Sequence, residues 1–290
     1  MSRLDSRRVE LEALLNREVM VPFAHNGKAR IFWRENGHGE PLLLIMGIGY
    51  TSDMWCHVEP GLAARYRTIV FDNRGVGQSD AVPGPHLIPT MAADAAAVLD
   101  AADVETAYVF GLSMGGYITQ EFALNYPRRV RALILGGASC GGENAVPAKQ
   151  EVWDVAQERL NMPPEKAVRA LVPYIYDAST PHERIEIDME IRLRTYPSAE
   201  SYKAQLEGIL QLESFGRLGE LRTPTLVIHG EHDQLVPPEN GRLLAEMIPG
   251  ARLEMLPEAS HMFTTDRPQE TVSTVLRFLD EYRQNAHVPS

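Results

Sequence analysis

The chain has 290 residues, of which 44% are hydrophobic and 23% are charged, as is typical of one large globular domain with room for an insertion. Its formal net charge is −11, and no basic stretch could neutralise phosphates, so we expect no nucleic-acid partner. The two cysteines, Cys56 and Cys140, are too few for a disulfide scaffold and have no metal-ligand spacing. The N-terminus does not resemble a signal peptide, and no run of about twenty apolar residues occurs. We therefore expect a cytoplasmic protein without a membrane span.

The first half of the chain alternates between strand and helix patterns. A charged helix or tail over residues 1–18 precedes two predicted strands, 19–24 and 29–34, which flank the hairpin signal Asn26-Gly27. Short apolar runs predict buried strands at residues 41–46, 68–71, 106–110 and 132–135. Helical spacing predicts helices between them at residues 55–64, 91–102 and 117–126.

The strand pattern stops after residue 140 and returns only near residue 225. Between these points we predict helices at residues 148–160, 164–172, 181–196 and 198–212. Two further strands (225–228 and 252–256) and two further helices (238–247 and 267–282) follow. The alternation predicts an α/β fold with a mostly parallel open sheet covered by helices on both faces. Residues 19–140 and 223–290 would form this core, and residues 141–222 an inserted all-helical cap.

A Gly-x-Ser-x-Gly motif lies between the predicted strand at 106–110 and the predicted helix at 117–126. Ser113 occupies its centre, and Gly111 and Gly115 give the backbone the room that a sharp strand-to-helix turn needs. The helix that follows would point its positive end and its unpaired first amides at the serine. Because such motifs also occur by chance, a structural turn without catalysis is the alternative interpretation.

A serine needs a base, and the base needs a third group to hold it. Sites in open α/β sheets form at the carboxyl ends of strands, so we searched the loops that follow the predicted strands. The loop after strand 225–228 contains Asp233, our candidate acid, and the loop after strand 252–256 contains His261, our candidate base. The alternatives are, for the acid, Glu231 and Asp72, and for the base, His229 and His232.

These motifs together resemble the α/β-hydrolase superfamily over about residues 19–282, and within it the small esterases and the 3-oxoadipate enol-lactonase type. The resemblance implies that Ser113 is the nucleophile, His261 the general base and Asp233 the residue that holds it. It also implies an oxyanion hole made by the backbone amides of Ile48 and Met114. Many relatives have histidine where this chain has Met46 and Val76, which puts the subfamily in doubt.

We expect a serine hydrolase that cleaves an ester or lactone of a small to medium apolar substrate, without a metal or organic cofactor. The alternatives are a carbon–carbon bond hydrolase or a cofactor-free perhydrolase with the same triad, and a ligand receptor on a hydrolase scaffold. A homo-oligomer is left open. Side chains that would line an apolar pocket are Tyr50, Trp55, Trp153, Tyr174, Met262 and Phe263. The charged run from Glu183 to Arg194 is interpreted as a solvated helix face.

Overall fold

The computed structural model describes residues 22–285, so the helix or tail predicted for residues 1–18 lies outside the described part. Eight strands form one sheet in the order β1-β2-β4-β3-β5-β6-β7-β8. Along the chain these strands are β1 (Phe23–Asn26), β2 (Ala29–Asn36), β3 (Pro41–Ile45), β4 (Arg67–Phe71), β5 (Ala107–Leu112), β6 (Val130–Gly136), β7 (Thr225–Gly230) and β8 (Arg252–Leu256). The β1/β2 and β2/β4 pairs are antiparallel and all the others are parallel, which confirms the predicted α/β class.

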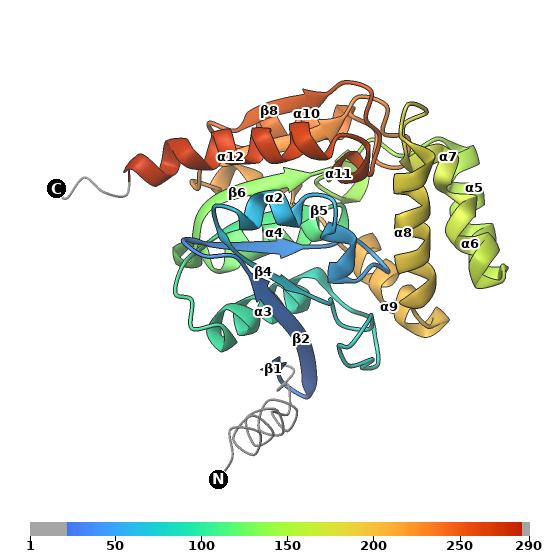
Figure 1. Ribbon diagram of the computed structural model, residues 1–290, viewed down its shortest axis with the longest axis horizontal. Coiled ribbons are helices and arrows are strands. Elements are labelled where there is room, and N and C mark those ends of the chain that lie inside the picture. Colours follow the sequence, from blue (N-terminus) through green and yellow to red (C-terminus); the bar gives the residue numbers. More distant parts are fainter. Residues whose placement is uncertain (1–21, 286–290) are drawn as a thin grey trace, which may run out of the picture.

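Helices cover both faces of this sheet (Figure 1). The helices of the α/β core are α2 (Glu59–Ala63), α3 (Ile88–Ala101), α4 (Met114–Asn125), α10 (Glu239–Met247), α11 (Phe263–Asp266) and α12 (Pro268–Asn285). Strand side chains alternate between the two faces, as in β3, where Leu43 belongs to the apolar core that includes residues of α3, α4 and α10 and Leu42 belongs to the one that includes residues of α2 and α12. Both side chains are completely buried, so the central strands read as continuous apolar runs in the sequence.

The chain between β6 and β7 is helical. It contains α5 (Gln150–Glu158), α6 (Pro164–Ala170), α7 (Val172–Ile175), α8 (His182–Arg194) and α9 (Ala199–Leu210). Figure 1 shows these five helices together beyond one end of the sheet, at the right of the view. No helix within the described residues is both long and apolar enough to cross a bilayer.

Two helices begin earlier than the sequence predicts. The predicted helix 91–102 begins at Ile88, because Pro89 fits the first turn, where its missing N–H leaves no hydrogen bond unmade. The predicted helix 117–126 begins at Met114, directly after Ser113. The serine therefore sits at the N-terminus of α4, closer to its free amides than the sequence pattern indicates.

Candidate active site

Ser113 occupies a strained turn between β5 and α4. Its φ of 57° and ψ of −121° are rare for a residue with a side chain. A Cβ atom on Gly115 would lie 1.9 Å from the Ile45 carbonyl oxygen, and one on Gly111 would lie 2.1 Å from the Gly115 carbonyl oxygen. Only glycine fits at these two positions, so the motif has a steric origin in this chain.

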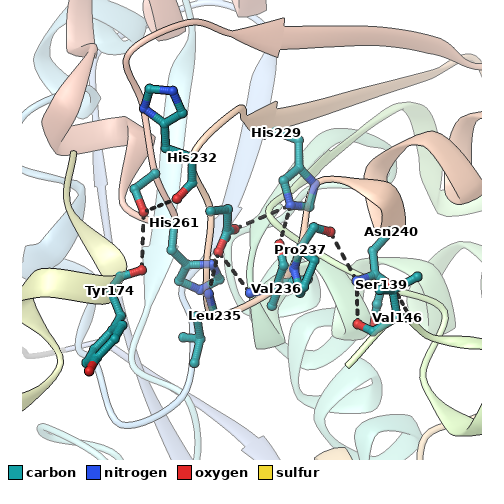
Figure 2. Close-up of polar contacts among 12 residues, drawn as sticks. Ser139, Val146, Tyr174, His229, His232, Leu235, Val236, Pro237, Asn240 and His261 are labelled. Atoms are coloured by element: carbon teal, nitrogen blue, oxygen red, sulfur yellow. Dashed lines mark hydrogen bonds and ion pairs between the residues drawn. The ribbon is translucent and has the colours of Figure 1, made fainter. Parts of the chain in front are cut away.

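Asp233 and His261 meet although they come from different strand-end loops. Figure 2 labels His261 beside Leu235 and Val236, which follow Asp233 in its loop. The Nδ1–H of His261 donates to Asp233 Oδ2 at 2.8 Å, and both side chains are buried. The other oxygen of Asp233 accepts the backbone N–H groups of Leu235 and Val236, which fixes the carboxylate in place. Burial raises the pKa of Asp233, but the charges and hydrogen bonds of His261 and His229 outweigh it and lower the pKa to about 2. The carboxylate is therefore ionised at neutral pH and holds the imidazole by one nitrogen.

The alternative acids have other partners or positions. Glu231 is exposed to solvent. Asp72 is buried, and its oxygens accept the N–H and O–H of Ser52 and the N–H of Gln78. Asp72 therefore clamps two loops together.

The alternative bases are also engaged elsewhere. His232 faces outward and pairs with Asp177 at 2.5 Å. His229 is completely buried, and its Nε2–H donates to the Val236 carbonyl at 2.7 Å while lying 3.3 Å from Asp233 Oδ2. We interpret His229 as a support for the Asp233 loop.

Ser113 and His261 both lie next to the dipeptide Gly136-Gly137 at the end of β6. The Ser113 N–H donates to the Gly136 carbonyl at 2.8 Å. A Cβ atom on the neighbouring Gly137 would lie 3.4 Å from His261 Nδ1. The Ser113 hydroxyl forms no hydrogen bond within residues 22–285, and neither does His261 Nε2. Serine and histidine therefore share one edge of the sheet, with both reactive atoms unengaged.

The backbone around Ser113 offers two free donors. The N–H groups of Ile48 and Met114 have no hydrogen-bond acceptor in the described part of the chain. Met114 is the first residue of α4, and Ile48 belongs to the loop after β3. That loop lies against the serine, because a Cβ atom on Gly47 would be 3.1 Å from Ser113 Cβ. Free amides beside a helix N-terminus are suited to hold an oxyanion.

The side chains expected to line a pocket are dispersed. Trp55 is completely buried, with its ring 4.9 Å from that of Phe110, and Trp153 on α5 is 37% exposed. One of these two tryptophans therefore lies in the core and the other at the surface. The Tyr174 carbonyl accepts the Ser260 hydroxyl, as Figure 2 shows.

Three other expected pocket residues lie closer to the candidate site. Met262, next to His261, donates its backbone N–H to Ile175. Phe263 reaches the end of β6, where a Cβ atom on Gly136 would be 2.8 Å from its ring. Tyr50 follows the Ile48 loop and stacks on an arginine of α8.

A polar cavity of about 460 Å³ lies elsewhere, between the middle of β2, the loops after β3 and β4, and the end of α8. Arg34, Asp72, Gln78 and Tyr196 are among its lining residues. Neither Ser113 nor His261 lines it. We therefore place the candidate active site by the polar geometry around Ser113 and not by this cavity.

A buried polar network joins α8 to the core, and the sequence reasoning missed it. Asp188 accepts from His57 Nε2 at 2.9 Å, from the Tyr176 hydroxyl at 2.9 Å and from the Thr265 hydroxyl at 2.7 Å. Hydrogen bonding to Asp188 raises the pKa of His57 to about 10. The side chains of Cys56, His57 and Asp188 lie close enough to share an ion, but donors of the protein already engage both Asp188 oxygens.

The interpretation of the charged run on α8 as a solvated face is wrong for two of its members. Asp188 is 0% exposed and Arg192 is 3% exposed, whereas Glu183 and Glu190 face solvent. The two buried residues are four positions apart and so share one helix face. Met189 and Ile191 are buried on the same helix. This spacing beside apolar residues is the signal that could have identified the inward face.

Asp266 supports the loop that holds the candidate base. Its carboxyl accepts the backbone N–H of Ser260, the residue before His261, at 2.7 Å and the Thr180 hydroxyl at 2.6 Å. Burial raises the pKa of Asp266 to about 6, despite these two hydrogen bonds. The chain thus connects the His261 loop to the helical segment through a buried carboxyl group.

Comparisons with known proteins agree with this architecture. A family model described as the alpha/beta hydrolase fold matches residues 40–173 and 188–268. The chain is 34% identical to "Putative carbamate hydrolase RutD" of Azorhizobium caulinodans, over 91% of this chain and 100% of that protein. It is 33% identical to a poly(3-hydroxyalkanoate) depolymerase of Ectopseudomonas oleovorans, over 86% and 87% of the two chains. The crystal structure of the enol-lactonase from Burkholderia xenovorans LB400 superposes with a TM-score of 0.80 at 26% identity, covering 89% of this chain and 100% of that one. The chain therefore belongs to the alpha/beta hydrolase family.

Proposed function

We propose that this protein is a serine hydrolase that cleaves an ester or a lactone through an acyl-enzyme on Ser113. The observation with the most weight is the buried His261–Asp233 hydrogen bond at the sheet edge where Ser113 occupies its strained turn. The names of the relatives, which include a depolymerase and an enol-lactonase, are consistent with this reaction class. Residues 141–222 would act as a cap over the site.

In the proposed first step, Ser113 Oγ attacks the substrate carbonyl carbon while His261 Nε2 accepts the hydroxyl proton. Asp233 stays ionised, holds the imidazole by Nδ1 and stabilises the imidazolium that forms. The negative charge that develops on the carbonyl oxygen would be held by the free amides of Ile48 and Met114.

In the second step, the tetrahedral intermediate collapses and His261 returns its proton to the departing alkoxide oxygen. Water then attacks the acyl-enzyme, again giving its proton to His261, and Ser113 leaves as the hydroxyl. Tyr50, Met262 and Phe263 are proposed to contact the substrate, because they flank the Ile48 loop and His261 in sequence and in space.

Burst kinetics test this proposal. With p-nitrophenyl butyrate we expect a rapid release of one p-nitrophenol per protein molecule and then slower multiple turnover, because this activated ester should acylate Ser113 faster than water hydrolyses the acyl-enzyme. Turnover that ends after about one event would instead support the receptor alternative. The absence of any turnover of esters or lactones by the folded protein would contradict the proposal.

A further inference from the structure

Two arginines of the helical segment are buried without a carboxylate partner in the described part of the chain. Arg192 on α8 is 3% exposed and Arg159, just after α5, is 6% exposed. Nε and Nη2 of Arg192 and Nε of Arg159 are buried without a hydrogen-bond acceptor within residues 22–285. Burying a cation with unpaired donors is costly, and buried polar groups normally have partners. Such an arrangement points to a partner that binds from outside the chain.

Both guanidinium groups stack on tyrosine rings beside the loop after β3. The central carbon of the Arg192 guanidinium lies 4.9 Å from the ring centre of Tyr50, and that of Arg159 lies 5.0 Å from the ring centre of Tyr202. Tyr202 packs against Gly49, where a Cβ atom would be 2.9 Å from the tyrosine ring. Stacking holds the guanidinium by its face and leaves its N–H edge to bind an anion.

The same loop reaches the candidate nucleophile. Gly47 contacts Ser113, Ile48 offers the proposed oxyanion donor, and Gly49 and Tyr50 carry the contacts to Tyr202 and Arg192. The two buried positive charges are therefore connected to the reaction site through one short loop.

The nearby acid, Asp188, forms no direct ion pair with Arg192 within the described residues. Burial lowers the pKa of the Arg192 guanidinium, but Tyr50, Tyr176 and Asp188 nearby outweigh this effect and raise the pKa. Asp188, one turn earlier on α8, has its oxygens engaged by His57, Tyr176 and Thr265. The Arg192 side chain makes a weak hydrogen bond from Nη1 to Met189 Sδ at 3.7 Å and interacts with the Tyr176 hydroxyl, and neither of these partners is a carboxylate.

Other arginines of the segment behave differently. Arg169 pairs with Glu186 at 2.7 Å and Arg194 pairs with Asp53 at 3.0 Å, both at the surface. The chain has a net charge of −11 and therefore more carboxylates than it needs to pair its cations. Two buried guanidinium groups without a carboxylate partner among the described residues are unusual in such a chain.

We infer that Arg192, together with Arg159, binds a carboxylate of the substrate, so that the preferred ester or lactone carries a second, anionic group. The guanidinium fork matches a carboxylate with two parallel hydrogen bonds. This inference rests on the proposed function, because it assigns the substrate class of that same site. It replaces the purely apolar pocket expected from the sequence with one that has a cationic end.

Binding to the Ser113→Ala protein tests the inference separately from catalysis. The probes are monomethyl glutarate, which has one free carboxylate, and dimethyl glutarate, which has none, both titrated by calorimetry. We expect the monoester to bind tenfold to roughly a hundredfold more tightly, as is usual for hydrogen bonds to a charged group. Adding Arg192→Met should remove this preference. Adding Arg169→Met, which deletes an exposed cap arginine and the same charge, should keep it.

Several outcomes overturn the inference. These are equal binding of the two esters, failure of the monoester to bind, and a preference that survives Arg192→Met. If thermal melting shows that Arg192→Met does not fold, Arg159→Met in the same background is the second test and should weaken the preference.

The experiments also distinguish failure of the proposed reaction from failure of the anion site. If the unmodified protein hydrolyses no ester while Ser113→Ala still prefers the monoester, the proposed reaction fails and the anion site stands. If esters are hydrolysed without such a preference, only the anion site fails.

Discussion

Ser113→Ala is expected to lower kcat for p-nitrophenyl butyrate by about a factor of 10⁶, because removing the nucleophile of a serine triad leaves only binding and oxyanion stabilisation. The substitution removes one oxygen atom that forms no hydrogen bond to a described residue, so the melting temperature should stay close to that of the parent. Steady-state kinetics and thermal unfolding measured side by side would separate loss of chemistry from loss of structure.

A matched control is available in the same chain. Ser273 on α12 is exposed and, among residues 22–285, donates only to the carbonyl of Glu270, so Ser273→Ala should keep parental activity. Hydrolysis by Ser113→Ala near the parental rate would remove Ser113 from the mechanism. In that case the strained turn would be a structural feature only.

Asp188→Ala is expected to lower the free energy of unfolding by about 3 kcal/mol or more, since removing one partner of a buried ion pair leaves the other charge uncompensated. His57 would lose its carboxylate, and the hydroxyls of Tyr176 and Thr265 would lose their acceptor. Urea unfolding followed by circular dichroism measures this difference. Glu186→Ala is the control, because Glu186 is on the same helix but pairs at the surface, where ion pairs contribute little.

The His57–Asp188 pair also predicts that the stability of the folded protein depends on pH. The pKa of His57 is raised to about 10 by its hydrogen bond to Asp188, so the folded protein holds this proton more tightly than the unfolded chain does. The resulting stabilisation is complete below the unfolded pKa, near 6.5, and is lost as the pH rises towards 10. The destabilisation by Asp188→Ala should therefore be smaller at pH 10 than at pH 6. This role of the network would be contradicted if Asp188→Ala caused only a small loss of unfolding free energy at pH 6, or if the loss were no smaller at pH 10.

The sequence alone identifies the sheet and the residues at its edge. Apolar runs such as 41–46 are typical of strands covered on both faces, and their alternation with helical segments leaves few topologies open. Ser113, Asp233 and His261 could be selected because each follows its own strand, and the carboxyl ends of parallel strands meet at one edge. The structure brings Asp233 and His261 into direct contact.

The helical segment is where the sequence is least informative. In α8, charges of both signs occur on several sides of the helix, and the apolar residues Met189 and Ile191 give only a short local signal of the side that faces the core. Burial of Asp188 and Arg192 depends on tertiary partners that come from distant parts of the chain, such as His57 and Tyr50. For the same reason, aromatic character did not distinguish Trp55, a core residue, from a pocket residue.

Covalent labelling tests the central claim most directly. A fluorophosphonate reacts much faster with an activated hydroxyl than with other side chains, so brief incubation followed by peptide mass spectrometry locates the nucleophile. We expect one adduct per chain, on Ser113, and strongly slowed labelling in His261→Ala, because that variant lacks the base. An adduct on a different residue, or no adduct at all with the correctly folded protein, would contradict the assignment of Ser113 as the activated nucleophile.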